Sequence, residues 1–174
     1  MENKIRGFEF VSTSQLEKDL IECGMVYEVE GNVHKGILNL PKRATKNSAG
    51  YDVFSPVSFV LEPNEEIKIP TLFKAYMQNG EFLMFVPRSG LGFKYYCRLA
   101  NTLGVGDGDY YNNENNEGHY WVKIRNEGNK NMVIKAGEAI CQAIFMPFLL
   151  ADNDNFDKGE IREGGFGSTT KVNN

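Results

Sequence analysis

The sequence predicts an all-β domain, built as a β-sandwich or a barrel. Three observations lead to this prediction. Short segments rich in β-branched and aromatic residues dominate the chain, turn-forming residues separate these segments, and only one segment has the pattern of a helix. Many short strands with few helices are typical of sandwiches and barrels, because such strands bury their apolar faces against other strands.

Seven segments have the length and composition of strands. They are bounded by residues that favour turns, as in the EPNEE stretch at 62–66 and the NEGNKN stretch at 126–131. The expected strands are residues 5–11, 57–61, 66–69, 82–86, 120–124, 132–134 and 139–149.

The segment SQLEKDLIECG, residues 14–24, is expected to form a helix. Ser14 can accept a hydrogen bond as the N-cap, and Glu17 stands at the reciprocal position of a capping box. Gly24 can end the helix, because glycine is common just after the last helical residue.

The length and charge of the chain limit the classes of protein to which it can belong. Its 174 residues suit one domain with a fair core and not two ordinary domains. The formal net charge of −4 argues against a partner such as nucleic acid or a membrane surface, which would require a concentrated basic face. Small anions are therefore the expected ligands, since an acidic protein can still hold a small basic pocket for phosphates.

The cysteines and histidines do not form a metal-binding pattern. Cys23, Cys97 and Cys141 are widely separated, and His34 and His119 are the only histidines, so the close ligand spacing of a zinc site is missing. Reduced thiols in a cytoplasmic protein explain these cysteines best. The N-terminus lacks the apolar core of a signal peptide, and no apolar run approaches the length of a membrane span. We therefore expect a cytoplasmic protein.

Two polar segments differ from the rest of the chain. Residues 1–150 are expected to form the folded domain, whereas apolar density falls in residues 151–174, which we expect to be a flexible tail. The stretch YNNENNEG at 111–118 is expected to form a protruding loop, and its asparagines suggest no chemistry of their own.

Three motifs are candidates for a site, although each has an ordinary structural explanation. PRSG at 87–90 offers a guanidinium, a hydroxyl and an open backbone N–H to phosphate oxygens, but it also suits a plain strand-to-loop junction. The aspartate of AGYD at 49–52 is more often a turn acceptor than a metal partner. GGFGST at 164–169 lacks the Walker A pattern, so it is either a tail or a lid that wraps a polyanion and stacks Phe166 on a flat ring.

Taken in order, five segments resemble the five sequence motifs of the trimeric deoxyuridine triphosphate nucleotidohydrolases (dUTPases). These segments are AGYD, PRSGLG, NTLGVGDGDY, GEAICQAIF and GGFGST, and the resemblance runs from about Leu40 to Thr170, including the spacing between motifs. The chain is similar to the longer members from bacteriophages and Gram-positive bacteria.

The resemblance implies a jelly-roll-like, distorted β-barrel that assembles as a homotrimer with an exchanged C-terminal tail. The implied reaction is hydrolysis of dUTP to dUMP and pyrophosphate with Mg²⁺, so that each active site draws on more than one subunit. This reaction limits the incorporation of uracil into DNA and supplies dUMP for the synthesis of dTMP.

The resemblance also implies roles for the residues of the GVGDGDY corner. Asp107 matches the general base that orients and deprotonates the attacking water, and Asp109 is given only a supporting role. Tyr110 matches the tyrosine that packs under deoxyribose and leaves no room for a 2′-hydroxyl. The residues implied to hold uracil are Asn101, Gly104, Val105 and Gly106.

Other motifs imply the phosphate and metal contacts. Arg88, Ser89 and Gly90 match the phosphate cradle, and Gln142 adds amide contacts to the phosphates. Asp52 matches an aspartate that contacts the Mg²⁺ shell through water. The residues implied to form the C-terminal lid over the substrate are Arg162, Phe166, Gly167 and Ser168.

Several positions depart from the family pattern. Gly106 stands where the family has an apolar residue, often isoleucine, which suggests a looser or differently shaped hairpin. Extra residues follow Tyr110, Arg162 stands one residue closer to the glycine-rich motif than in many relatives, and Thr170 replaces a common glycine. The first forty or so residues include segments, among them the expected helix, that compact members of the family lack.

Three alternatives remain open at this stage. A dCTP deaminase shares the fold but needs a catalytic glutamate at C4 of the base. A regulatory protein of the same fold would bind a protein partner through the 111–118 loop, with or without catalysis. A β-sandwich with a disordered tail and no activity is the third.

Overall fold

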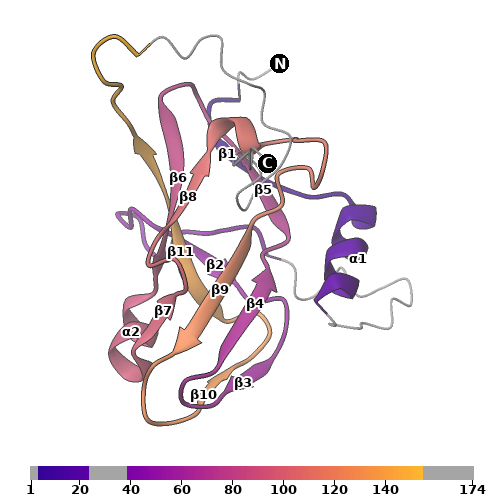
Figure 1. The fold of residues 1–174 in the computed structure, drawn as a ribbon, viewed down its shortest axis with the longest axis vertical. Helices are drawn as coiled ribbons and strands as arrows, with labels where there is room; N and C mark the ends of the chain where they lie inside the picture. The colour runs from indigo at the N-terminus through magenta and orange to yellow at the C-terminus, as the bar shows by residue number, and fades with distance from the viewer. Residues whose placement is uncertain (1–3, 24–38, 155–174) are drawn as a thin grey trace, which may run out of the picture.

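The computed structural model describes residues 4–23 and 39–154, which form a mostly-β fold with two short α-helices (Figure 1). The all-β fold class predicted from the sequence is confirmed. The described elements are β1 (Gly7–Phe10), α1 (Thr13–Glu22), β2 (Tyr51–Phe54), β3 (Phe59–Leu61), β4 (Glu66–Pro70), β5 (Phe73–Tyr76), β6 (Glu81–Pro87), α2 (Ser89–Tyr95), β7 (Cys97–Leu99), β8 (Gly104–Asp107), the 3₁₀ turn η2 (Gly108–Tyr110), β9 (Trp121–Asn126), β10 (Met132–Ile134) and β11 (Ala139–Pro147).

The strands pair in four small antiparallel sheets. The largest has the order β2-β11-β6-β8, and a second has the order β4-β9-β7. The pairs β1-β5 and β10-β3 complete the set. The sheets do not close into a continuous barrel within the described ranges, and the arrangement is jelly-roll-like. Helix α1 lies beside the strands on one side of the molecule, and α2 lies near β7 (Figure 1).

One apolar core joins these sheets. Phe73 of β5, Leu83 of β6, Ile124 of β9 and Met132 of β10 are each at most 1% exposed. Strand β9 shows why the sequence forms a strand here, since its buried and less buried positions alternate along its length. Successive side chains of a strand point to opposite faces, so this alternation places one face in the core.

All seven predicted strands overlap observed strands, but the sequence prediction missed others. Strands β2, β5 and β7 were missed, as was β8, whose GVGD sequence contains two glycines. Helix α2 was also missed, because its SGLGFKY sequence has low helix propensity and the preceding PRSG stretch suits a strand-to-loop junction.

The predicted cap of the first helix was wrong by two residues. The N-cap is Ser12, whose Oγ accepts a hydrogen bond from the backbone N–H of Gln15 at 3.2 Å. Its own backbone N–H donates to the carboxylate of Glu117 at 2.9 Å. The cap is thus chosen by a contact distant in sequence. Gly24, the predicted end of this helix, lies outside the described residues.

Candidate active site

A tight turn at residues 100–103 carries the chain from one sheet to another. Strand β7 before the turn pairs with β9, whereas β8 after it pairs with β6. The N–H of Thr102 donates to the carbonyl of Leu99 at 3.0 Å, and Thr102 has φ +65°, in the left-handed region. This crossing between two sheets leaves a hollow between β8 and β9.

A pocket of about 460 Å³ occupies this hollow. That volume lies in the range of small-molecule sites. Predicted site residues that line it are Asn101, Gly104, Val105, Gly106, Asp107 and Tyr110. The other lining residues are Phe85, Leu99, Ala100, Tyr120, Trp121, Val122 and Lys123. The structure thus brings together the residues of the third motif, and the pocket defined by these residues is called the β8 pocket below.

Close packing surrounds both glycines of β8 and is tighter at Gly106 than at Gly104. A Cβ at Gly104 would lie 3.1 Å from the Cβ of Phe85, and a Cβ at Gly106 would lie 2.6 Å from the hydroxyl oxygen of Tyr120. Gly106 was expected to make the hairpin looser or differently shaped than it is with the usual apolar residue. The hairpin is not loose at this position, because the ring of Tyr120 fills the space that a larger side chain at position 106 would need.

Sequence reasoning missed Tyr120 as a residue of the pocket. The signal that could have found it was the glycine at position 106. A missing apolar side chain in a well-packed protein requires a larger neighbour, because cores are packed at the density of organic crystals. The ring of Tyr120 lies 5.1 Å from that of Tyr110, so the two tyrosines form one aromatic wall.

Tyr110 is held rigidly in this wall. Its side chain is 5% exposed, and its hydroxyl donates to the backbone carbonyl of His119 at 3.0 Å. The side-chain amide of Asn116 donates to the same hydroxyl at 2.7 Å. Both hydrogen bonds come from the segment just after Tyr110, so this segment determines where the ring stands.

The stretch 111–118, expected to form a protruding loop, consists of turns that fold back on Tyr110. The side-chain amide of Asn113 donates to the carbonyl of Tyr110 at 2.8 Å and to Asn116, while its side-chain oxygen accepts from two backbone N–H groups. Gly118 has φ +81°, and a Cβ there would lie 2.5 Å from the carbonyl oxygen of Tyr110. The asparagines therefore do have a role, which is to fold the stretch back on Tyr110.

Asp107 lies at the end of β8, opposite Phe82 of β6, and is half-buried at the pocket. Asp109 is exposed and does not line the β8 pocket. The geometry therefore separates the two acids of the motif, with Asp107 facing the pocket and Asp109 on the outside.

The residues of the first, second and fourth motifs form another group, called the Asp52 cluster. The side-chain amide of Gln142 donates to Oδ1 of Asp52 at 3.0 Å, and Nε of Arg88 lies 3.6 Å from the same oxygen. Asp52 is 6% exposed, so its charge is balanced locally by the guanidinium. Arg88 precedes α2, which begins with Ser89 and Gly90. The cluster thus places one guanidinium beside the open start of a short helix.

The β8 pocket and the Asp52 cluster stand apart within one chain. In β6, Phe82 pairs with Asp107 on one side, whereas Val86, four residues on, pairs with Gln142 of β11 on the other. Four residues of antiparallel strand span about 14 Å and two strand spacings about 10 Å, so Asp107 and Gln142 lie roughly 17 Å apart. None of the three Asp52-cluster residues lines the β8 pocket.

The remaining predicted residues belong to the C-terminal segment. Arg162, Phe166, Gly167 and Ser168 lie outside the described residues. Within residues 4–23 and 39–154, no group of three or more His, Cys, Asp or Glu side chains is arranged to hold a metal ion. Helices long and apolar enough to span a membrane are likewise absent from these ranges.

Comparisons with known proteins identify the family. The dUTPase family model matches residues 38–170. The deoxyuridine 5'-triphosphate nucleotidohydrolase of Lactococcus lactis is 43% identical over 166 residues, covering 95% of this chain and 98% of that protein. The enzyme of the same name from Tolumonas auensis is 39% identical over 75% of this chain and 86% of its own.

A solved structure agrees with this result. The crystal structure of the dUTPase from Streptococcus mutans superposes with a TM-score of 0.64 at 37% identity, covering 84% of this chain and 98% of that one. The dUTPase from phage phi11 of S. aureus, at 22% identity and a TM-score of 0.56, shares the fold. The family match, the close relatives and the shared fold lead to one conclusion: the chain belongs to the dUTPase family.

Proposed function

We propose that this chain hydrolyses dUTP to dUMP and pyrophosphate, with Asp107 as the general base. One observation carries the assignment of the site. Among the described residues that line the β8 pocket there is a single carboxylate, and it belongs to the last residue of β8, a strand at the edge of its sheet. Such a pocket suits a small flat base next to a group that can activate water.

In this proposal the backbone of residues 101–106 recognises uracil. Uracil presents an acceptor, a donor and an acceptor along one edge, which fixed amides and carbonyls can match. Cytosine reverses two of these groups, and each buried polar group left unpaired costs about 1–3 kcal/mol. The side-chain amide of Asn101, at the mouth of the β8 pocket, adds a contact to the base.

Tyr110 excludes ribose in this proposal. Its ring forms a rigid wall of the β8 pocket, because two hydrogen bonds fix its hydroxyl. A ring that cannot move aside leaves no room for the additional 2′-hydroxyl of UTP. Deoxyribose packs against it without a clash.

Catalysis then requires one proton transfer and one displacement at phosphorus. Asp107 accepts a proton from a water molecule as the water oxygen attacks the α-phosphorus, and the bond from this phosphorus to the bridging oxygen breaks. Negative charge develops on the departing pyrophosphate. Donors placed in advance for this charge lower the barrier, and Arg88, Ser89, Gly90 and Gln142 are the proposed donors.

A second copy of the chain completes this site in the proposal. Asp107 lies roughly 17 Å from Gln142 in the same chain, as strand spacing and register require. A general base must lie within hydrogen-bond reach of the water that it activates, close to the phosphates. The proposed homotrimer satisfies this requirement if the Asp52 cluster of one subunit faces the β8 pocket of its neighbour.

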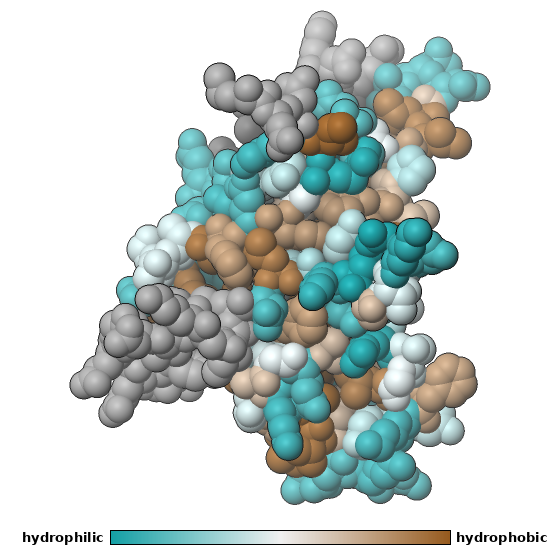
Figure 2. All heavy atoms as spheres, turned by 180° about the vertical axis from the view of Figure 1, so that it is seen from behind, coloured by the Kyte–Doolittle hydropathy of each residue, from teal (hydrophilic) through white to brown (hydrophobic). Residues whose placement is uncertain are grey.

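Exposed apolar side chains support an assembly of several copies. They reach the surface in several places (Figure 2), with Phe93 of α2 at 91% exposure and Leu149 at 96%. Val60 of β3 and Val133 of β10 form a pair of facing strand residues that are both exposed. Adjacent exposed apolar side chains, as in the Val60–Val133 pair, are what a surface that contacts a partner requires, whereas single ones are ordinary.

The proposed cofactor is Mg²⁺, held mainly by the substrate phosphates. Magnesium keeps several of its waters and is usually bound through one or two carboxylates together with phosphate oxygens, so a dedicated cage of protein ligands is not needed. Asp52 is a single carboxylate whose Oδ1 already accepts a hydrogen bond from Gln142 and lies near Arg88. It therefore fits a contact to the ion through a water molecule better than direct coordination. When bound, the ion would neutralise charge on the phosphates.

We propose two further features of the chain, its domain and its lid, from the motif resemblance. Residues 1–150 are taken as one dUTPase domain and residues 151–174 as a C-terminal lid over the substrate. The lid residues proposed to contact substrate are Arg162, Phe166, Gly167 and Ser168. Removal of residues 160–174 is expected to depress turnover far more than stability, and a large fall in thermal stability would contradict the lid.

Location in the cytosol is part of the same proposal. The thiols of Cys97 and Cys141 are free and buried, and burial raises the pKa of Cys97 to about 11. Such thiols stay protonated at neutral pH and unreactive, as expected in a reducing compartment. The proposed role there is to limit uracil in DNA and to supply dUMP.

Two alternatives receive less support from the site. A dCTP deaminase would need a glutamate at C4 of the base, but Asp107 is the only acid among the described residues that line the β8 pocket. A regulatory role through residues 111–118 has fewer side chains available, because those of Asn113 and Asn116 are hydrogen-bonded to Tyr110.

The test is a pyrophosphate-release assay with dUTP, UTP, dCTP and dTTP in the presence of Mg²⁺. Release from dUTP well above release from the other three supports the proposal. Release of ammonia from dCTP would support the deaminase, and no release from any of the four nucleotides would refute both enzymes.

A further inference from the structure

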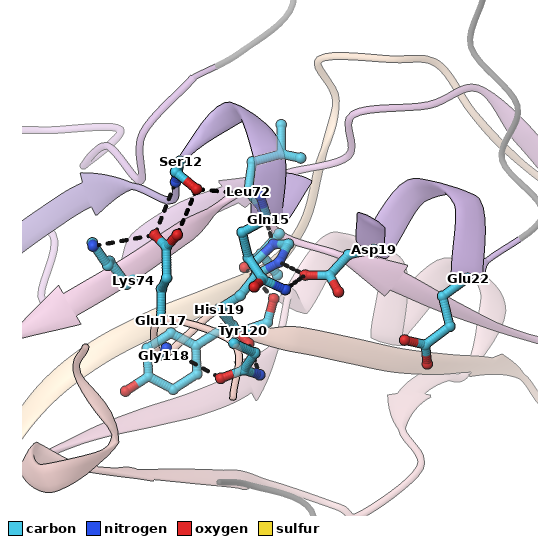
Figure 3. A network of polar contacts seen from close by, with 12 residues as sticks. Ser12, Gln15, Asp19, Glu22, Leu72, Lys74, Glu117, Gly118, His119 and Tyr120 are labelled. Carbon is cyan, nitrogen blue, oxygen red and sulfur yellow. Dashed lines mark hydrogen bonds and ion pairs between the residues drawn. The ribbon is translucent and has the colours of Figure 1, made fainter. Parts of the chain in front are cut away.

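A buried polar network joins helix α1 to the segment that follows Tyr110 (Figure 3). Asp19 of α1 is 3% exposed, and His119, just before β9, is fully buried. These two side chains meet with Nδ1 of His119 at 2.5 Å from Oδ2 of Asp19. Neither residue lines the β8 pocket, so their burial needs an explanation other than direct contact with substrate.

The hydrogen bonds fix the tautomer of His119. The backbone N–H of Leu72 donates to Nε2 of the ring at 2.8 Å, so Nε2 must carry a lone pair and not a proton. The ring proton is therefore on Nδ1 and is donated to Asp19. Gln15 donates to the same carboxylate oxygen at 2.8 Å. Burial raises the pKa of Asp19, but the hydrogen bonds from His119 and Gln15 outweigh it and hold the pKa below its ordinary value.

The main chain of His119 links this pair to the wall of the β8 pocket. Its carbonyl accepts the hydroxyl of Tyr110, and its N–H donates to the carbonyl of Asn116. Asn116 in turn donates to the Tyr110 hydroxyl. Both groups that hold this hydroxyl thus belong to residues 116–119, which Asp19 anchors through the imidazole.

The N-terminal end of α1 is hydrogen-bonded to the same segment, residues 116–119. Glu117 accepts hydrogen bonds from the backbone N–H and the hydroxyl of Ser12, the N-cap of α1, and lies 3.5 Å from the ammonium of Lys74 (Figure 3). Between the two ends, Leu16 packs with Leu72 in a small apolar cluster. Helix α1 is therefore attached to residues 117–119 at its N-cap and again at Asp19 in its C-terminal half.

We propose that Asp19 is a positioning residue for Tyr110, and that α1 acts as a brace that sets the discrimination between deoxyribose and ribose. This inference rests on the proposed function of Tyr110. Asp19 touches no substrate; it acts by holding His119, whose carbonyl holds the tyrosine hydroxyl. Loss of the carboxylate frees residues 116–119 to shift, so the ring of Tyr110 can move aside and admit a 2′-hydroxyl.

The test compares selectivity with stability in the full chain. The quantity measured is the ratio of kcat/KM for dUTP to kcat/KM for UTP, together with the thermal unfolding midpoint. Asp19→Ala is expected to lower this ratio at least fivefold, mainly by improving the use of UTP. Asp19→Asn retains an acceptor for the Nδ1 proton and is expected to stay near the wild-type ratio.

Two controls separate positioning from a general loss of stability. Ile134→Val removes a buried methyl group in β10, outside the network, and should lower the midpoint without changing the ratio. Tyr110→Phe removes the anchored hydroxyl and should lower the ratio by itself, and adding Asp19→Ala to it should have no further effect. The proposal is overturned if Asp19→Ala leaves the ratio unchanged. It is also overturned if Asp19→Ala lowers the ratio in the Tyr110→Phe background as much as it does in the wild type.

Further measurements keep the test decisive. If Asp19→Ala does not fold, Glu117→Ala is tested in its place, because it loosens the partly exposed N-terminal attachment of α1. This variant is expected to lower the ratio to a smaller extent. An unchanged ratio in Glu117→Ala counts against the brace. Equilibrium binding of dUMP and UMP gives the same comparison without turnover. Wild-type protein that prefers dUMP but leaves dUTP intact would refute the proposed reaction, while the brace would still be judged by the binding ratio.

Discussion

A Cβ atom added at Gly106 would lie 2.6 Å from the hydroxyl oxygen of Tyr120, closer than Cβ atoms approach other atoms in real structures. The glycine and the tyrosine therefore act as a matched pair, in which the small residue on β8 admits the large ring that precedes β9. The ring of Tyr120 also contacts those of Phe85 and Tyr110. This pair gives the β8 pocket its aromatic wall.

Gly106→Ile is expected to lower the free energy of unfolding by about 1–3 kcal/mol, because the added side chain overpacks the space held by Tyr120. Combining it with Tyr120→Leu restores the total volume, so the double variant should recover at least half of the lost stability. Urea unfolding of the two single variants and the double variant measures this coupling. A double variant no more stable than Gly106→Ile would show that the two positions are not a matched pair.

Asp107→Asn is expected to reduce turnover of dUTP by about 10²–10⁴-fold, the usual contribution of a general base. Nucleotide binding should persist, because the amide has nearly the same shape as the carboxylate. Pyrophosphate release and calorimetric binding of dUMP measure the two quantities. Asp109→Asn is the matched control, since Asp109 is exposed and does not line the β8 pocket, and it should retain most of the activity.

Mixing two inactive variants tests whether subunits share a site. In the proposed homotrimer, Asp107→Asn and Arg88→Ala are each expected to be inactive on their own. When the two chains are refolded together at equal amounts, random trimers should restore about a quarter of wild-type turnover, because each mixed ring contains one intact site. If the mixture stays as inactive as its components, Asp107 and Arg88 do not come from different subunits of one site.

Stability is expected to fall in acid through Asp19. Burial raises its pKa, but hydrogen bonds from His119 and Gln15 leave it lowered overall in the folded protein. A lowered folded pKa contributes stability that is present above the unfolded value of about 3.9 and is lost as the pH falls through the folded value. Asp19→Asn should therefore cost about 1–3 kcal/mol at pH 7 and less as the pH falls below about 4. Urea unfolding between pH 7 and pH 3 measures the difference, and a gap independent of pH would exclude this role of the charge.

The strands that the sequence predicts are those whose own residues have the alternation or the β-branched and apolar composition typical of strands. Strand β9 alternates buried and less buried positions, and β4 and β11 are rich in β-branched or apolar residues. Strand β8 carries no such signal, because GVGD has two glycines, and it is a strand only because β6 provides its hydrogen-bonding partner. Helix α2 likewise forms from a sequence with low intrinsic helix propensity.

Contacts between distant residues decided the details around α1. The sequence predicted Ser14 as the cap, whereas Ser12 caps the helix in the structure, where Glu117 accepts its N–H and hydroxyl. The asparagines at 113 and 116 suggest a solvent-exposed loop by composition alone. Their actual partner is Tyr110, because the stretch turns back on the residue that it follows.

The order and spacing of its motifs were enough to identify the family to which this chain belongs, since these are written directly in the sequence. Only the tertiary structure decided how the motif residues are grouped, with Asp107 and Tyr110 at the β8 pocket and Asp52, Arg88 and Gln142 across the sheet. The physical reason is strand register, which places residues in space by hydrogen-bonded pairing and not by their distance along the chain.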